Sequence, residues 1–175
     1  MVQELEKMGK EIINVLMIVD ASQLHQVLAD TIAHFSRNGM PGLFFSTTKP
    51  TRFFQEELIK KKVDVEKIIF LESMVDESNI YKNVVFVQTL EDLTGISIVL
   101  EAFIQEPSQE KYVLIDSLDL LKMYNNQEIV FNFVEQITQL CTLNKTNCIM
   151  MTSKKDEDGF VTKIKPFFKK VLFKV

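Results

Sequence analysis

The stretch IINVLMIVDASQLHQVLADTIAHFSRNG (residues 12–39) contains the two hydrophobic patterns that decide the fold. Ile12–Val19 is a nearly continuous apolar run, rich in β-branched residues, that ends at Asp20. Such a run is typical of a central strand buried on both faces. The next apolar positions recur at the spacing of one helical stripe: Leu24, Val27, Leu28, Thr31, Ile32 and Phe35. The stretch therefore predicts a buried strand followed directly by a helix, which Asp20 or Ser22 can cap and Asn38-Gly39 can end.

Short apolar strands and longer helices alternate along the rest of the chain. Further strands are expected at Leu43–Phe45, Ile68–Leu71, Val84–Val87, Tyr112–Ile115, Cys148–Met151 and Val171–Val175. Further helices are expected from Pro50 to Lys62, from Leu93 to Ile104 and from Glu128 to Leu143. This order predicts βαβ units, and hence an α/β fold of three layers with a mostly parallel central sheet covered on both faces.

Length and composition are those of one globular domain, with 175 residues of which 46% are hydrophobic and 25% charged. Residues 1–175 are expected to form that single domain, with a short N-terminal helix at 1–11 and a closing strand segment at 160–175. The net charge of −4 disfavours nucleic acid and anionic membranes as primary partners. No apolar run reaches the roughly 18–20 residues that span a bilayer, so a cytoplasmic location is expected.

Glycine is scarce, with 5 residues where a usual content of about 7% would give about 12. They are scattered along the chain: Gly9, Gly39, Gly42, Gly95 and Gly159. A loop that holds phosphate needs clustered glycines, because the backbone N–H groups must approach the ligand closely. The sequence therefore contains no glycine-rich nucleotide-binding loop.

Six segments, in serial order, resemble the RecA-like ATPase core and in particular its KaiC-like branch. They are IINVLMIVD (12–20), LFFST (43–47), KKKVDVEKIIFLE (60–72), VQTLEDLTGISIVLEAF (87–103), YVLIDSLDLL (112–121) and CIMMTSKKDEDGFVTKIKPFFKKVLFKV (148–175). The resemblance covers nearly the whole chain and implies a fold like that of the P-loop NTPases. It also implies a Walker B-like strand with Asp116 and Ser117 at its tip.

The sequence departs from the family pattern at two places, and each departure removes residues that the family uses to bind or hydrolyse ATP. In the family the first strand leads into a Gly-rich loop ending in Gly-Lys-Ser/Thr, whereas this chain continues as Asp20-Ala21-Ser22-Gln23. A carboxylate at Asp20 repels phosphate where the missing lysine attracts it. The family also has an acidic pair after the second strand, which activates the attacking water, and this chain has Ser46-Thr47-Thr48-Lys49 instead.

The resemblance and its departures together imply a catalytically inactive domain, a pseudo-ATPase that needs no cofactor and turns over no small-molecule substrate. Because RecA-like domains assemble side by side, a regulatory or scaffolding role is expected, by self-association or by pairing with a related active ATPase. The N-terminal helix at 1–11 and the polar segment Glu72–Asn83 are candidate contacts.

An alternative is a non-standard nucleotide or Mg²⁺ site, or a weak ATPase, at the carboxyl ends of the strands, where ligands gather in open α/β sheets. The candidate residues are Asp20, Ser22, Asp116, Ser117, Ser153 and Lys154. If the first strand lies near the Asp116 strand, Asp20 and Asp116 could share a cation through oxygen ligands. The competing interpretation is that both carboxylates cap helices at strand-to-helix junctions.

Metal binding through histidine or cysteine is not expected. His25 and His34 are nine residues apart, and Cys141 and Cys148 lack the C-x-x-C spacing of a zinc or redox site, which suggests reduced, buried thiols.

The C-terminal segment mixes lysines and phenylalanines: Phe160, Lys163, Lys165, Phe167, Phe168, Lys169, Lys170 and Phe173. This mixture suggests a weaker alternative, in which bases of single-stranded nucleic acid stack on the rings. The favoured interpretation is an edge strand whose phenylalanines face inward and whose lysines discourage pairing with another molecule.

Overall fold

The computed structural model describes residues 4–5, 13–48, 50–73, 82–107, 110–153 and 159–174. Its strands are β1 (Asn14–Val19), β2 (Gly42–Ser46), β3 (Ile68–Glu72), β4 (Val84–Phe86), β5 (Lys111–Ile115), β6 (Thr146–Thr152) and β7 (Lys170–Lys174). Its α-helices are α2 (Leu24–Arg37), α3 (Thr51–Lys60), α4 (Leu93–Gln105), α5 (Leu118–Tyr124), α6 (Gln127–Leu143) and α7 (Phe160–Ile164). Two short 3₁₀ turns, η1 (Val65–Lys67) and η2 (Lys165–Phe167), precede β3 and β7.

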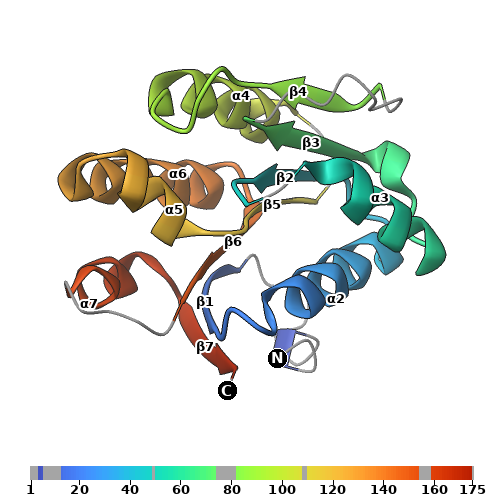
Figure 1. Ribbon diagram of the computed structural model, residues 1–175, viewed down its shortest axis with the longest axis horizontal. Helices are drawn as coiled ribbons and strands as arrows, with labels where there is room; N and C mark the ends of the chain where they lie inside the picture. The colour runs from blue at the N-terminus through green and yellow to red at the C-terminus, as the bar shows by residue number, and fades with distance from the viewer. Residues whose placement is uncertain are drawn as a thin grey trace.

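The strands form one sheet in the order β4-β3-β2-β5-β6-β1-β7, and every neighbouring pair is parallel (Figure 1). Successive side chains of a strand point to opposite faces. Phe44 and Leu114 belong to the core beneath α2 and α3, whereas Phe45 and Ile115 belong to the core beneath α4, α6 and α7. Because helices cover both faces, the structure confirms the predicted three-layer α/β/α arrangement with a parallel central sheet.

The predicted end of the first helix is confirmed. Asn38 is the C-cap of α2, and Gly39 follows in the left-handed region with φ of +74°. Glycine adopts this conformation without the steric cost of a Cβ, so the chain can leave the helix there and enter β2.

The closing segment at 160–175 becomes a strand only at its end, close to the strand predicted at Val171–Val175. Phe160, Val161 and Ile164 are buried on one side of α7, and η2 follows before the chain becomes extended. Only Lys170–Lys174 is a strand, and it pairs in parallel with β1 at the edge of the sheet. The helix α5 is also absent from the sequence prediction, because its seven residues are too few to show a clear helical period.

The two candidate contact segments lie mostly outside the described residues. Of the N-terminal helix at 1–11, Glu4 and Leu5 are described; both are helical, and Leu5 is buried. Of the Glu72–Asn83 segment, residues 74–81 lie outside the described part. Among the described residues, no helix has both the length and the apolar character needed to cross a bilayer.

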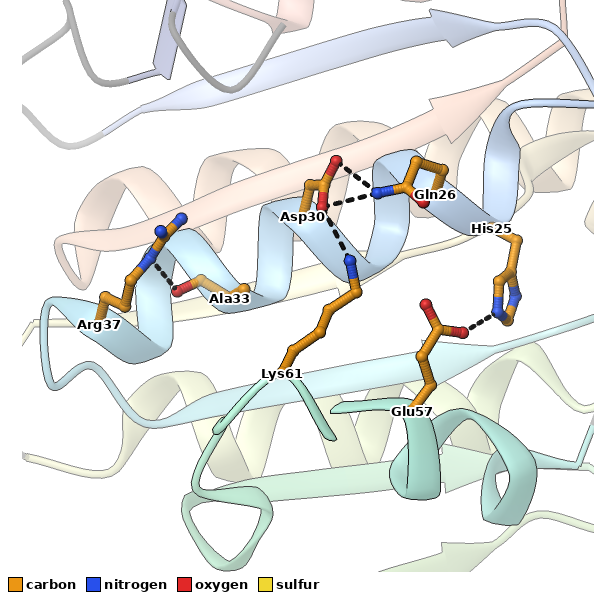
Figure 2. A network of polar contacts seen from close by, with 7 residues as sticks. All are labelled: His25, Gln26, Asp30, Ala33, Arg37, Glu57 and Lys61. Carbon is orange, nitrogen blue, oxygen red and sulfur yellow. Dashed lines mark hydrogen bonds and ion pairs between the residues drawn. The ribbon is translucent and has the colours of Figure 1, made fainter. Parts of the chain in front are cut away.

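Helices α2 and α3 are joined by polar contacts on their solvent side (Figure 2). The Asp30 carboxylate accepts hydrogen bonds from Gln26 at 2.8 Å and from the Lys61 ammonium at 3.2 Å. Nearer the start of α2, the His25 ring contacts the Glu57 carboxylate. These side chains are partly exposed to solvent, so each pair contributes at most about 1 kcal/mol to stability.

The side chain of Tyr112, on β5, is buried in the core beneath α2. Its hydroxyl allows a test of how this core tolerates a buried polar group. Its ring stacks on Phe35 with centroids 4.7 Å apart, and its hydroxyl has no hydrogen-bond partner in the described structure. Burial raises the pKa of Tyr112 far above its ordinary value of 10.0, so the hydroxyl is neutral.

Tyr112→Phe is expected to raise the free energy of unfolding by about 1–2 kcal/mol, because it removes a buried polar group that makes no hydrogen bond. Urea denaturation of the two chains measures the difference. A less stable Tyr112→Phe chain would show that the hydroxyl has a hydrogen-bond partner.

Candidate functional site

The connection between β1 and α2 is a tight turn of four residues, Asp20–Gln23. The Gln23 N–H donates to the Asp20 backbone carbonyl at 2.9 Å. The Asp20 carboxylate accepts hydrogen bonds from the Ser22 N–H at 3.0 Å and from the Ser22 hydroxyl at 2.8 Å. The N-cap residue of α2 is Gln23, whose side chain makes no capping hydrogen bond. The prediction that Asp20 or Ser22 caps this helix is therefore wrong. Asp20 instead stabilises the turn before it.

This turn determines what the start of α2 can bind. A helix N-terminus holds phosphate with free backbone N–H groups and its positive dipole end. Here the N–H groups of Ser22 and Gln23 already donate within the turn, and the exposed carboxylate of Asp20 lies in the same turn, four residues before Leu24, the first residue of the helix. The negative charge of Asp20 therefore disfavours the binding of an anion, such as a phosphate, at this turn.

Asp116, immediately after β5, is 1% exposed and accepts four hydrogen bonds. Its Oδ1 accepts from the Thr47 N–H at 2.9 Å and the Thr47 hydroxyl at 2.6 Å. Its Oδ2 accepts from the Thr48 hydroxyl at 2.8 Å and the Ser46 hydroxyl at 3.3 Å. Burial raises the pKa of Asp116 above its ordinary value of 3.8, while the hydrogen bonds from Thr47 and Thr48 act in the opposite direction.

Ser117, not Asp116, caps the following helix, because its hydroxyl accepts from the Leu120 N–H at 3.3 Å. The capping interpretation of Asp116 is therefore wrong. Its carboxylate holds the segment that follows β2, which lies beside β5 in the sheet. Both of its oxygens are engaged by protein donors.

Glu72 extends this arrangement to the next strand. Ser46 pairs in register with Glu72, and Phe45 pairs with the residue before Asp116, so Glu72, Ser46 and Asp116 form one row across β3, β2 and β5. The Glu72 carboxylate is buried and accepts from the Thr51 N–H at 2.6 Å, at the start of α3. Its other oxygen, the Thr51 hydroxyl and the Gln55 amide are buried without hydrogen-bond partners in the described structure. Asp116 and Glu72 thus hold the two ends of the β2–α3 connection.

Ser153, at the end of β6, belongs to a separate cluster. Its N–H donates to the Asp119 carboxylate at 2.6 Å, and the Thr152 hydroxyl donates to the same carboxylate at 3.1 Å and 3.2 Å. Sequence reasoning missed Asp119, although it stands three residues after Asp116 in the same Asp-Ser-Leu-Asp segment. Lys154 lies outside the described residues.

The structure does not bring Asp20 and Asp116 together. Strand β6 lies between β1 and β5, so the strands that end at these residues are two sheet spacings, or roughly 10 Å, apart. Asp20 is exposed and Asp116 is buried. The alternative in which these two carboxylates share a cation is therefore not supported by their placement. Within the described ranges, no group of three or more histidine, cysteine, aspartate or glutamate residues is arranged to hold a metal ion.

The C-terminal phenylalanines do not form a row of stacking rings. Phe160 and Phe168 are buried in the core, whereas Phe173 is 59% exposed with the Lys165 ammonium 5.9 Å from its ring centroid. Buried rings cannot stack on bases, which speaks against nucleic-acid binding here. Strand β7 is an edge strand as the favoured interpretation expects, but its phenylalanine, Phe173, is exposed and does not face inward. Cys141 and Cys148 are buried and form no disulfide, in agreement with the sequence prediction.

Comparison with known proteins shows the fold. No family model matches the sequence, and no curated protein matches it. Among solved structures, the chain is similar to the crystal structure of a KaiC-like protein from the hyperthermophilic archaeon Pyrococcus horikoshii, with a TM-score of 0.60 and 15% sequence identity. The similarity covers 91% of this chain and 71% of that chain. The chain therefore has the RecA/KaiC-like fold that its segments predict, with a short acidic turn between β1 and α2.

Proposed function

We propose that this chain is a catalytically inactive RecA/KaiC-like domain, which acts as a regulatory or scaffolding subunit through contacts with other proteins. The observation that carries the proposal is the β1–α2 turn. There the Ser22 and Gln23 N–H groups donate to Asp20, and the carboxylate precedes the helix. The turn supplies neither an open ring of amides nor a cation for a triphosphate.

The segment after β2 supports the same conclusion. A water-activating base needs a carboxylate or imidazole within reach of the attacking water. Ser46, Thr47 and Thr48 are hydroxyl residues, and all three hydroxyls donate to Asp116. The Asp116 carboxylate therefore serves to hold this loop, and its oxygens are not free to bind Mg²⁺ or a water ligand.

Phosphate release from ATP in the presence of Mg²⁺ is expected to equal the rate without protein. An Asp116→Asn chain serves as the matched control. ATP hydrolysis by the wild-type chain that disappears in the Asp116→Asn chain would contradict the proposal.

Exposed apolar side chains support the interaction role. Met123, Tyr124 and Ile129 are all at least half exposed and stand within seven residues where α5 leads into α6. Single exposed apolar residues are common, but neighbouring ones mark a surface at which burial against another protein is favourable.

Sedimentation velocity tests this role with the wild-type chain, alone and mixed with a KaiC-like ATPase from the same source. Self-association or complex formation below about 100 μM is expected, and the triple change Met123→Ser, Tyr124→Ser and Ile129→Ser is expected to weaken it at least tenfold, by roughly 1.4 kcal/mol or more. The control replaces three exposed apolar residues elsewhere, Ile59, Ile98 and Leu143, with serine and should leave association unchanged. A chain that stays monomeric both alone and in the mixture would contradict the interaction role.

A further inference from the structure

The charges of the chain are segregated along its sequence. Residues 159–175 contain no aspartate or glutamate, and their charged residues are five lysines: Lys163, Lys165, Lys169, Lys170 and Lys174. Residues 1–158 hold the other 15 lysines and arginines and all 24 aspartates and glutamates, which gives them a net charge of −9. Residues 159–175 are therefore a cationic segment in an otherwise acidic chain.

This cationic segment lies at one edge of the sheet. It contains α7, η2 and β7, and β7 is the last strand in the sheet order (Figure 1). Strand β7 pairs with β1 on one side, and in the described part of the chain no strand lies on its other side. An edge strand presents N–H and C=O groups with which an extended peptide can pair as a further strand.

The two faces of β7 differ in chemistry, because successive side chains of a strand alternate between them. Lys170 and Leu172 lie on the face that α2 covers, where Leu172 is part of the core. Val171 and Phe173 lie on the opposite face, and Phe173 is 59% exposed. A strand added beside β7 would therefore meet an ammonium group on one face and an uncovered aromatic ring on the other.

Three lysines of the segment offer a positive charge to a partner. Lys163 is exposed, and Lys165 and Lys170 are half-buried. Within the residues that the structure describes, these three side chains form no ion pair. The Lys165 ammonium lies 5.9 Å from the ring centroid of Phe173, so a cation also stands beside the exposed ring.

These charges favour one kind of partner over two others. A second copy of this chain would bring its own lysines to the edge, and like charges on neighbouring strands destabilise their pairing. A nucleic acid supplies negative charge but has no peptide backbone to pair with the N–H and C=O groups of β7. An acidic peptide strand supplies both, because opposite charges on neighbouring strands stabilise the pair.

We propose that β7 binds an extended acidic segment of a partner protein, which joins the sheet as a further strand. In this segment acidic residues alternate with apolar ones, so that a carboxylate lies beside Lys170 while an apolar side chain covers Phe173. The proposal rests on the interaction role proposed above and adds the chemistry of a partner.

Fluorescence anisotropy with a labelled peptide of sequence Glu-Val-Glu-Val-Glu-Val-Glu tests the proposal on the full chain. Saturable binding with a Kd below about 100 μM is expected at low salt, and the affinity should fall as salt screens the ion pairs. A copy N-methylated along its backbone loses the N–H donors, and a copy with lysine in place of glutamate loses the negative charges. Each copy is expected to bind at least about tenfold more weakly. No saturable binding of the first peptide up to about 1 mM, or undiminished binding of either copy, would overturn the proposal.

Variants locate the binding at β7. The double change Lys165→Glu and Lys170→Glu is expected to weaken peptide binding at least about tenfold, with urea denaturation to confirm that the chain folds. The control Lys60→Glu with Lys67→Glu makes the same change in net charge on α3 and η1, and it should leave the affinity nearly unchanged. Phe173→Ser removes an exposed ring, so the fold should tolerate it while peptide binding weakens. Unchanged affinity in both the double variant and Phe173→Ser would overturn the proposal.

Competition separates an acidic strand from other polyanions. Displacement of the labelled peptide by oligo(dT) or by phosphatidylserine vesicles at lower concentrations than by the unlabelled peptide would overturn the proposal. The triple change at Met123, Tyr124 and Ile129 should leave peptide binding intact, because these residues lie on α5 and α6. Failure of peptide binding in a chain that still associates in sedimentation velocity would therefore remove this proposal alone.

Discussion

Asp116→Ala is expected to lower the free energy of unfolding by about 3–5 kcal/mol. The carboxylate is almost completely buried and accepts hydrogen bonds from Ser46, Thr47 and Thr48. Alanine at position 116 leaves these donors without an acceptor and leaves a cavity after β5, next to β2. The β2–α3 connection then loses one of its two anchors.

Thermal and urea unfolding measure this effect. A loss of this size lowers the midpoint by about 6–20 °C, at 2–4 °C per kcal/mol for a chain of this length. Asp30→Ala is the matched control, because Asp30 also accepts several hydrogen bonds but lies on the solvent side of α2. Its expected cost is about 1 kcal/mol or less. Equal losses in the two variants would contradict the anchoring role of Asp116.

The pH dependence of this effect has a defined sign. Burial raises the folded-state pKa of Asp116 above the ordinary value of 3.8, so the folded chain holds this proton more tightly than the unfolded chain. The resulting stabilisation is complete below pH 3.8 and is lost as the pH rises through the folded-state pKa. Wild type is therefore expected to exceed Asp116→Asn in stability by a larger margin near about pH 4 than near about pH 7. A margin that grows with pH would show that the hydrogen bonds outweigh burial.

Gly42→Ala is expected to lower the free energy of unfolding by about 3 kcal/mol, because it forces an atom into a filled part of the core. A Cβ added at Gly42 would lie 2.1 Å from Cζ of Tyr112, its partner in the neighbouring strand. The Tyr112 ring is fully buried and stacked on Phe35, so it has little room to move. Glycine at position 42 is therefore required by the close approach of this ring.

A double-mutant cycle isolates that contact. Tyr112→Ala alone is expected to cost about 3–5 kcal/mol through the cavity that it leaves. The Gly42→Ala change should cost much less in the Tyr112→Ala background than in wild type, since the clashing ring is gone. Additive losses in the double variant would refute the steric explanation.

The hydrophobic pattern was sufficient to predict the strands but not their order. Strands β1 and β5 are buried on both faces as expected, yet β6 lies between them in the sheet. Strand β6 follows β5 in the chain, and its position between β5 and β1 depends on packing of helices, which local periodicity does not report. The alternative in which Asp20 and Asp116 share a cation depended on that order, and their strands are not neighbours.

Short elements and long-range partners were also beyond the sequence pattern. Helices α5 and α7 have seven and five residues, too few to establish a helical period. The hydroxyls that bind Asp116 come from about 70 residues earlier in the chain. A capping role for Asp116 was the better local inference, because only the register of β2 against β5 reveals those donors.

The central claim concerns the turn at Asp20, and thermal unfolding with nucleotides tests it most directly. The full chain is unfolded with and without millimolar ATP or ADP, each with and without Mg²⁺. A ligand present at 100 times its dissociation constant stabilises a protein by about 2.7 kcal/mol, which raises the midpoint by roughly 5–10 °C for a chain of this size. The account predicts no shift beyond about 1 °C with any nucleotide. A Mg²⁺-dependent rise of several degrees would contradict it, because nucleotide would then bind despite the acidic turn between β1 and α2.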